Sequence, residues 1–390
     1  MSELIIKLTD RIDSVNVEEV REKVNAQIAE EHSAVVFDGD GLCYISSVGL
    51  RVLLKVINDE KKAGNEQVRF VNASPEVYDI LATTGFDMLM DVTKAYRQLD
   101  VTGKEVIGQG FYGIVYRYDD DTIVKVYKGE DSIPLIMNEK KMAKLAFVKG
   151  IPTAISYDIV KVGDDYGSVF EMIRSSTYNQ RIIDEPDNTD RIIREYVDLI
   201  KQIHSTEMEE GDIPEAKEIF MRYLYDLKDI LSVAQIGMIR KLLVWLPKDL
   251  HVVHGDLQMK NVMISDGEPM IIDMDTLSSG SPIFDLQALY VTYMAFNEDE
   301  PDNCEKFLGI SAEMAVHIWN RIMEYYFDTK DPETLGKLED KIRLLAYIRF
   351  MYILTKSDHK NSELYKIRIE HSIRHIEELL EKVEDLYLEI

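Results

Sequence analysis

One stretch of the chain, residues 254–261, combines side chains that could transfer a phosphoryl group. Asp256 can accept a hydroxyl proton, Asn261 follows five positions later, and Asp273 lies beyond a predicted short hairpin. A base, an amide and a second acid in this order supply a proton acceptor and two magnesium ligands in phosphoryl transfer. A single Asp near an Asn usually means a turn or a helix cap, so the prediction rests on all three residues together.

Short apolar runs surround these three side chains. Val252-Val253 precedes the first acid, residues 262–264 follow the amide, and residues 269–272 lead to the second acid. Such runs are typical of buried strands. We therefore expect each polar side chain to lie at the end of a strand, which would hold it rigidly.

A glycine-rich segment upstream has the spacing of a phosphate-binding loop. Gly108, Gly110 and Gly113 form a GxGxxG pattern, which dinucleotide folds and nucleotide-phosphate hairpins share. A dinucleotide fold continues into a helix, whereas residues 114–118 are β-branched and aromatic and end at a run of aspartates. The sequence therefore predicts a β-hairpin at this loop.

The next predicted strand, residues 122–127, carries a lysine among apolar neighbours. Lys125 could reach nucleotide phosphates from this position, and the predicted helix that follows carries Glu139. An ion pair with Glu139 would keep the lysine charged and aimed. The strand that leaves this region would place Glu171 to Ile173 as a hinge whose backbone meets adenine.

The composition narrows the class of protein. A chain of 390 residues is too long for one compact core, so we expect two or three domains. The net charge of −26 argues against nucleic acid and favours cationic substrates or basic partners, although an acid surplus equally serves solubility. No apolar run approaches the roughly 20 residues of a spanning helix. With no basic leader and only Cys43 and Cys304 as cysteines, we expect a cytoplasmic protein that does not enter a membrane.

Strand and helix patterns alternate through residues 3–98. Strands are expected at residues 3–8, 34–37 and 67–71. Helices are expected after the capping residues at positions 13–16, 46–47 and 74–76. The pattern predicts a small α/β domain.

Within this region, residues 38–54 and 72–86 resemble a STAS domain, the fold of anti-sigma-factor antagonists. The resemblance covers residues 1–98 and implies a regulatory domain whose partner is anti-sigma-factor-like or another regulatory protein. In that family the serine at a helix N-terminus is phosphorylated to control partner binding, and Ser47 is the closest match, with Ser46 as the neighbouring alternative. Many relatives have Asp where Ser46 stands, and a serine at a helix start is also an ordinary N-cap.

From residue 99 onward the chain resembles the aminoglycoside phosphotransferase branch of the protein-kinase-like fold. Residues 254–256 read His-Gly-Asp, with glycine where protein kinases carry arginine, residues 273–275 read Asp-Met-Asp instead of Asp-Phe-Gly, and no Ala-Pro-Glu segment follows. The glycine loop is more complete than in many small-molecule relatives, and Lys260 precedes the amide. These two departures leave a protein substrate open.

The resemblance implies a role for each residue of the predicted site. By this resemblance Asp256 is the catalytic base, Asn261 and Asp273 bind magnesium, and Lys125 binds the phosphates. Asp275 would assist with the metal, and Asp285 would brace the catalytic loop.

The predicted architecture joins two kinds of domain. An α/β STAS-like domain over residues 1–98 precedes an α+β kinase-like bilobal domain, with a small β-rich N-lobe at 99–174 and a helical C-lobe at 175–390. Helices of the C-lobe are expected at residues 189–204, 213–246, 286–296, 312–327, 338–354 and 362–388. His204 ends one of them without an evident partner, so we interpret it as a helix-end histidine. The last helix has a near-heptad pattern that could meet a partner helix, but packing on its own lobe is preferred.

Together these features predict an ATP- and magnesium-dependent phosphotransferase that acts on a hydroxyl of a small molecule, with a cationic acceptor favoured by the acid surplus. One alternative is a serine protein kinase that acts on a STAS domain or another partner protein. The other is a regulatory protein that binds nucleotide without turnover. The intact set of Lys125, Asp256, Asn261 and Asp273 argues against the second alternative.

Overall fold

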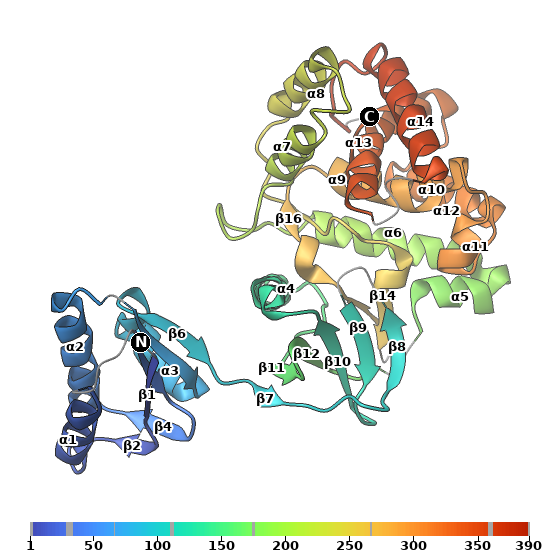
Figure 1. The fold of residues 1–390 in the computed structure, drawn as a ribbon. Coiled ribbons are helices and arrows are strands. Elements are labelled where there is room, and N and C mark those ends of the chain that lie inside the picture. The colour runs from blue at the N-terminus through green and yellow to red at the C-terminus, as the bar shows by residue number, and fades with distance from the viewer. Residues whose placement is uncertain are drawn as a thin grey trace. The chain divides into compact units, whose positions relative to one another are not determined.

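The computed structural model describes residues 3–28, 34–65, 67–109, 113–173, 176–265, 267–357 and 362–388. The chain divides into two compact units (Figure 1). Residues 1–100 and 159–163 form the first unit, and residues 101–158 and 164–390 form the second. Within the described ranges, none of the helices has the length and apolar character needed to cross a membrane.

The first unit is built on a parallel sheet. Its strands, in spatial order, are β1 (Glu3–Lys7), β3 (Ala34–Asp38), β5 (Val68–Ala73) and β6 (Asp91–Lys94). Its helices are α1 (Val17–Ile28), α2 (Ser47–Lys62) and α3 (Pro75–Thr83). Two further parallel pairs join β2 (Asp10–Ile12) to β4 (Leu42–Ile45) and β7 (Arg97–Gln98) to β11 (Asp158–Val162). The predicted α/β fold is confirmed.

Local sequence signals explain the helix ends of this unit. Ser46 caps α2 and Ser74 caps α3, each through its side chain to the backbone N–H three positions on. Gly85, at φ +79°, ends the turn after α3 in the left-handed region that favours glycine. Phe37 and Phe70, from neighbouring strands, are fully buried between the sheet and its helices.

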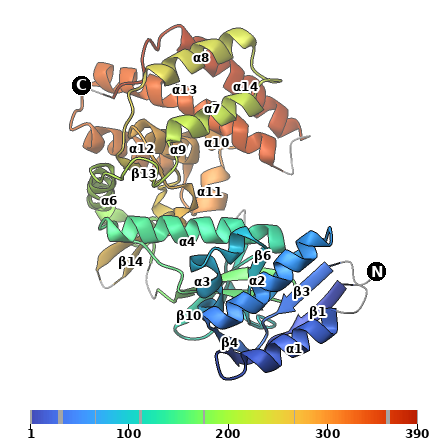
Figure 2. The same ribbon diagram turned by 90° about the vertical axis from the view of Figure 1, so that its left-hand side faces the viewer.

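The second unit begins with an antiparallel sheet. Its strands, in spatial order, are β12 (Asp165–Glu171), β10 (Thr122–Tyr127), β9 (Gly113–Arg117) and β8 (Glu105–Gln109). Helix α4 (Ile133–Val148) contacts β12, and it is seen end-on in Figure 1 and along its length in Figure 2. The strands on either side of residues 110–112 therefore pair as a β-hairpin, as predicted.

Helices make up most of the rest of the second unit, and both views show them gathered on one side of the sheet (Figure 2). They are α5 (Tyr178–Asp184), α6 (Thr189–His204), α7 (Ala216–Asp226), α8 (Val233–Trp245), α9 (Ile283–Tyr290), α10 (Phe296–Glu298), α11 (Asn303–Leu308), α12 (Ala312–Tyr326), α13 (Pro332–Lys356) and α14 (Glu363–Leu380). Trp319, Tyr196 and Tyr347 are fully buried at the centre of this helical region. The predicted helical C-lobe is confirmed.

Three predicted helices differ from the observed ones. The predicted helix 213–246 is two helices, because Ser232 and Gln235 form a capping box that starts α8 afresh. The predicted helix 286–296 contains a π-helical turn at Val291–Ala295. Helix α14 ends at Leu380 and not near residue 388.

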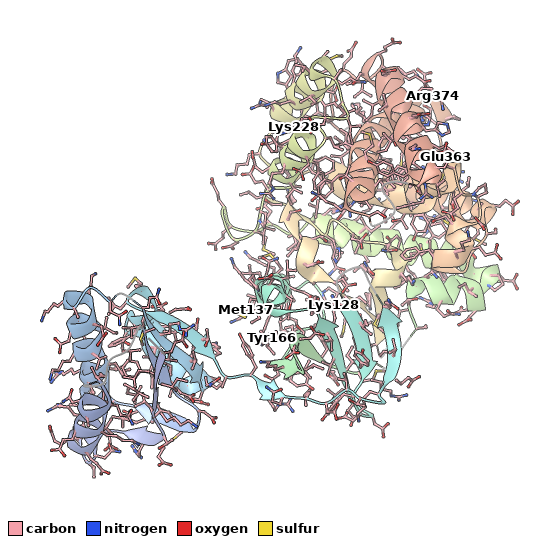
Figure 3. The ribbon with its side chains drawn as sticks, viewed as in Figure 1. Lys128, Met137, Tyr166, Lys228, Glu363 and Arg374 are labelled. Carbon is pink, nitrogen blue, oxygen red and sulfur yellow. The ribbon has the colours of Figure 1, made fainter. Side chains whose placement is uncertain are left out.

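Helix α14 packs on α13, which confirms that it docks on its own lobe. Glu363 and Arg374 mark this helix in Figure 3. The side chains it buries against the lobe include Ile376 and Leu379.

Candidate active site

Two short antiparallel strand pairs position the catalytic loop. β13 (Val252–Val253) pairs with β16 (Ser278–Ser279), and β14 (Val262–Ser265) pairs with β15 (Glu268–Ile271). Asp256 follows β13, Asn261 precedes β14, and Asp273 follows β15. Each of the three predicted side chains lies beside the end of a strand, as the apolar runs indicated.

Asp256 and Asn261 form one hydrogen-bonded group. The Asn261 amide Nδ2 donates to the carbonyl oxygen of Asp256 at 2.9 Å and to its carboxylate Oδ2 at 3.0 Å. Gln258 Nε2 also donates to Oδ2, at 3.2 Å. These bonds hold the carboxylate in one orientation while its side chain stays 35% exposed, so a hydroxyl group can reach it.

Gly255 lets the loop turn sharply before the base. Its φ is +83°, and a Cβ atom there would lie 2.9 Å from the carbonyl oxygen of Thr276. Only glycine adopts this conformation without strain and without that collision. The glycine that replaces the arginine of protein kinases is therefore required by the backbone of this loop.

A buried carboxylate holds the same loop from the core. Asp285 is fully buried on α9 and accepts the backbone N–H of His254 at 2.9 Å and that of Gly255 at 2.5 Å. The His204 ring Nε2 lies 2.9 Å from Asp285 Oδ2. Burial favours the neutral acid, but the hydrogen bonds from His204 and His254 keep the pKa of Asp285 below its usual value. The placement supports the predicted bracing role.

His204 ends α6, as predicted, but the interpretation that it has no partner is wrong. Besides Asp285, its ring Nδ1 lies 2.8 Å from the Tyr326 hydroxyl, and the residue is buried. Helix α6 thus supports the catalytic loop through a histidine–carboxylate pair. No local pattern could have revealed it, because both partners are far from His204 in the sequence.

Lys125 connects three elements of the second unit. Its Nζ lies 3.1 Å from Glu139 Oε1 on α4 and 2.7 Å from Asp273 Oδ1 after β15. Burial alone would favour the neutral amine, but Asp273 and Glu139 raise the pKa of Lys125 above its usual value. The predicted ion pair with Glu139 is present, and Asp273 lies within reach of the same ammonium.

Glu139 has a second partner that sequence reasoning missed. The Tyr127 hydroxyl, two positions beyond Lys125 on β10, donates to Glu139 Oε2. One residue earlier on α4, the Asn138 amide donates to the carbonyl oxygen of Asp275 at 3.4 Å. Helix α4 is therefore attached both to the sheet and to the segment after Asp273. The alternation of a strand places Lys125 and Tyr127 on one face, which is the signal that could have found it.

The two acids after β15 lie in different environments. Asp273 has a left-handed backbone, with φ +61°, and a side chain that is 42% exposed. The Asp275 carboxyl is more enclosed, and burial together with Glu139 and Asp273 raises its pKa to about 7. Asp273 is thus the more exposed member of the pair.

The glycine loop is described in part. Gly113 cannot carry a side chain, because a Cβ there would lie 2.5 Å from the carbonyl oxygen of Val126. Gly108 has room for one, with the nearest contact, to Val115, at 3.5 Å. Gly110 lies outside the described residues. The close approach of β9 to β10 therefore accounts for one glycine of the pattern.

The predicted hinge follows the last strand of the sheet. Glu171 ends β12 opposite Thr122, and Met172 N–H donates to the carbonyl oxygen of Asp121 at 2.8 Å. Ile173 is half-buried before the chain enters the helical region. Contact of Glu171 and Ile173 with adenine stays a prediction.

The residues around the base fit a magnesium ion coordinated mainly by non-protein oxygens. Asn261 directs its amide nitrogen at Asp256, which leaves its amide oxygen for a cation, and the exposed Asp273 supplies a carboxylate. Among the described residues no group of three His, Cys, Asp or Glu side chains gathers around one point. Two protein ligands suit Mg²⁺, which usually keeps waters and phosphate oxygens as its other ligands.

Ser46 and Ser47, the two candidate phosphorylation sites of the first unit, differ in their contacts. Ser46 is half-buried and its Oγ accepts the Gly49 N–H at the start of α2, at 3.5 Å. Ser47 is the first residue of the helix and is exposed. Ser46 therefore acts as the N-cap, and Ser47 is the serine with an accessible hydroxyl.

Family models match two parts of the chain. A model described as STAS domain matches residues 2–100. A model described as phosphotransferase enzyme family matches residues 105–311.

Individual proteins resemble each part. BtrV of Bordetella bronchiseptica, described as an anti-sigma factor antagonist, is 32% identical over 92 residues, which cover 24% of this chain and 78% of that protein. A choline/ethanolamine kinase family protein from Mesorhizobium loti is 16% identical, with a TM-score of 0.47 over 72% of this chain and 89% of its own. A gentamicin complex of APH(2'')-IIa is also 16% identical, with a TM-score of 0.48 over 69% of this chain and 90% of its own.

Proposed function

The chain belongs to the phosphotransferase enzyme family and carries a STAS domain, and we propose that it transfers the γ-phosphate of ATP to a hydroxyl group of a small molecule. The observation that carries the proposal is the convergence of Lys125, Glu139 and Asp273 at one side of the site and of Asp256 and Asn261 at the other. This set contains a phosphate-binding cation, magnesium ligands and a proton acceptor.

Each side chain has one task in the proposed reaction. Asp256 accepts the proton of the acceptor hydroxyl, while its bonds to Asn261 and Gln258 keep the carboxylate aimed. Lys125 binds nucleotide phosphates with its orientation fixed by Glu139. Asn261 and Asp273 hold Mg²⁺, which would neutralise charge on the phosphate oxygens when bound.

A turnover assay tests this proposal. The full-length protein is incubated with Mg²⁺-ATP and a panel of aminoglycosides, amino alcohols, sugars, hydroxy acids and protein serines, and ADP release and phosphorylated product are measured. We expect product with at least one small molecule. Nucleotide binding without any acceptor-dependent ADP release would favour the regulatory protein without turnover, and product on protein serines alone would favour the protein kinase.

For the first unit, we propose a regulatory role in which phosphorylation of Ser47 changes binding to an anti-sigma-factor-like or other protein partner. The likeness to an anti-sigma factor antagonist supports such a partner, and the exposed hydroxyl of Ser47 supports this serine over the capping Ser46. A phosphate at a helix N-terminus is locally favourable, because free backbone N–H groups and the helix dipole attract negative charge.

Mass spectrometry of protein from its native cell tests for this phosphate. Pull-downs with Ser47→Asp and Ser47→Ala should then recover different partners, while thermal stability stays nearly the same. Unmodified serines and identical partners for both variants would leave helix capping as the sufficient role. The kinase that adds the phosphate is a separate question, since this chain or another enzyme could supply it.

A further inference from the structure

A cavity of about 730 Å³ opens beside the proposed base. Its walls come from α7, from Gly255, from Asp275 and Thr276, from α9, and from Arg349 and Tyr352 on α13. A space of this size beside a proton acceptor suits the acceptor molecule. The charges on its walls therefore bear on which acceptor it takes.

Arg349 is a charged residue of the cavity wall that lies close to the proposed base. Its Nη2 lies 3.9 Å from Asp256 Oδ1, and its side chain is only 14% exposed. That separation is too long for a hydrogen bond, and within the described residues the guanidinium forms no other ion pair and no hydrogen bond. A largely enclosed guanidinium with unused donors is best satisfied by a carboxylate or phosphate, which it can bind through two parallel bonds.

Lysine side chains of the protein lie over two of the aromatic rings of the cavity. The Tyr352 ring stacks on Tyr223, with ring centroids 3.9 Å apart, and the ammonium group of Lys356 lies 5.0 Å from the Tyr352 centroid. Lys228, which follows α7 and is labelled in Figure 3, lies 4.4 Å from the centroid of Tyr225. The protein's own cations thus already occupy one face of the Tyr352 and Tyr225 rings.

Of the acids on the cavity wall, Glu218 is exposed and Asp226 is already paired. Asp226 pairs with Lys356 at 2.9 Å. Arg222, on the exposed face of α7, adds a second guanidinium at the cavity. The cavity wall therefore carries two guanidinium groups that the overall net charge of −26, the basis for expecting a cationic acceptor, does not reveal.

We propose that the acceptor is a small hydroxyl compound that also carries an acidic group, a carboxylate or a phosphate, and that Arg349 binds this group. The inference rests on the proposed phosphotransferase function and specifies its acceptor. In the reaction, the acceptor oxygen bonds to the γ-phosphorus, the bond from that phosphorus to the bridging oxygen of ADP breaks, and the hydroxyl proton passes to Asp256. The separation of 3.9 Å between Arg349 and Asp256 is short enough for one hydroxy acid to contact both.

Matched acceptors test this assignment. Titration calorimetry in the presence of Mg²⁺-ADP measures binding of four sets of compounds of similar size: hydroxy carboxylic acids, phosphorylated sugars, amino alcohols and neutral polyols. Turnover with Mg²⁺-ATP is measured on the same sets. We expect one of the two anionic sets to bind and react best. A preference for the hydroxy carboxylic acids would identify the acidic group as a carboxylate, and a preference for the phosphorylated sugars would identify it as a phosphate.

Variants at position 349 test whether the Arg349 side chain binds the acidic group of the acceptor. Arg349→Met keeps much of the side-chain length and Arg349→Lys keeps the charge, and both should weaken binding of the anionic acceptor, the former by about tenfold to a hundredfold. Arg240→Met removes an exposed charge from α8, outside the cavity wall, and should leave the affinity unchanged.

Preference for amino alcohols or aminoglycosides, or equal losses by Arg349→Met for all four sets, would overturn the assignment and leave the phosphotransferase proposal intact. Absence of binding by all four sets would also overturn it. Failure of the protein to bind Mg²⁺-ATP at all would instead refute the proposed function.

Discussion

The substitution Asp285→Asn tests whether a buried carboxylate orients the catalytic loop. The amide has nearly the same shape, but one oxygen that accepts a hydrogen bond becomes an NH₂ donor. In the structure both oxygens are used, by the backbone N–H groups of His254 and Gly255 and by the His204 ring. Either orientation of the amide therefore sets a donor against a donor at a site that is fully buried.

The size of the effect follows from those bonds. A hydrogen bond to a charged acceptor contributes about 1.5–3 kcal/mol, and removing part of a buried charge pair leaves its partner unsatisfied. We expect Asp285→Asn to lower the free energy of unfolding of the second unit by about 2–4 kcal/mol. Because the loop that carries Asp256 loses its anchor, kcat should also fall by about a hundredfold, as small misplacements of catalytic groups can cause.

Urea unfolding followed by tryptophan fluorescence measures the free energy of unfolding of the second unit selectively. Both tryptophans, Trp245 and Trp319, belong to the second unit, so the signal does not include the first. Asp299→Asn is the control, since it removes a carboxylate of low exposure that pairs with His371 away from the loop. That variant should lose stability without a comparable loss of kcat.

The pH dependence supplies a further check on Asp285. Its pKa lies below the ordinary value of 3.8, so its contribution to stability is present above that value and disappears as the pH falls below it. The stability difference between the wild-type protein and Asp285→Asn should therefore be constant from about pH 8 to 5 and shrink below about pH 4. Unchanged stability and kcat in this variant would refute the bracing argument, and lost stability with normal kcat would limit Asp285 to a structural role.

The other predictions concern the loop and the metal. Asp256→Asn should lower transfer by roughly 10²- to 10⁴-fold while ATP affinity, measured by calorimetry, is retained; transfer at the normal rate would remove Asp256 from the mechanism. Asp273→Ala should weaken ATP binding only when Mg²⁺ is present, so equal losses with and without the metal would contradict its role as a ligand. Gly255→Ala should lower the urea midpoint of the fluorescence transition and reduce kcat, because its Cβ would meet the Thr276 carbonyl at 2.9 Å, and a variant of normal stability would show that the loop can relax.

Features that depend on nearby residues could be predicted from the sequence. The cap at Ser46 and the strand at Val252-Val253 were predictable because each follows from a few adjacent side chains. The ion pair of Lys125 with Glu139 was predictable because the lysine follows the glycine-rich hairpin and the next predicted helix carries the glutamate.

Contacts between distant segments were not predictable in the same way. His204 and Asp285 meet only after α6 and α9 have packed, and Arg349 reaches Asp256 from the middle of a helix whose pattern indicates packing alone. The end of α14 shows how tertiary contacts override a local pattern. Lys341 Nζ binds Asp385 Oδ1 at 2.6 Å and the carbonyl oxygen of Tyr387 at 2.7 Å, which fixes residues 381–388 across α13 in a non-helical path.

The double attachment of Glu139 bears on how this enzyme could be switched off. Many regulatory mechanisms depend on rotating one helix outward so that a single ion pair breaks. Here such a rotation would have to separate Glu139 from both Lys125 and Tyr127 and also release Asn138 from the Asp275 carbonyl. Breaking three contacts together is unfavourable, so we expect α4 to stay attached beside the proposed nucleotide site. Inhibition of this chain is therefore expected to work by blocking substrate entry or nucleotide exchange, with the nucleotide site itself remaining assembled between catalytic cycles.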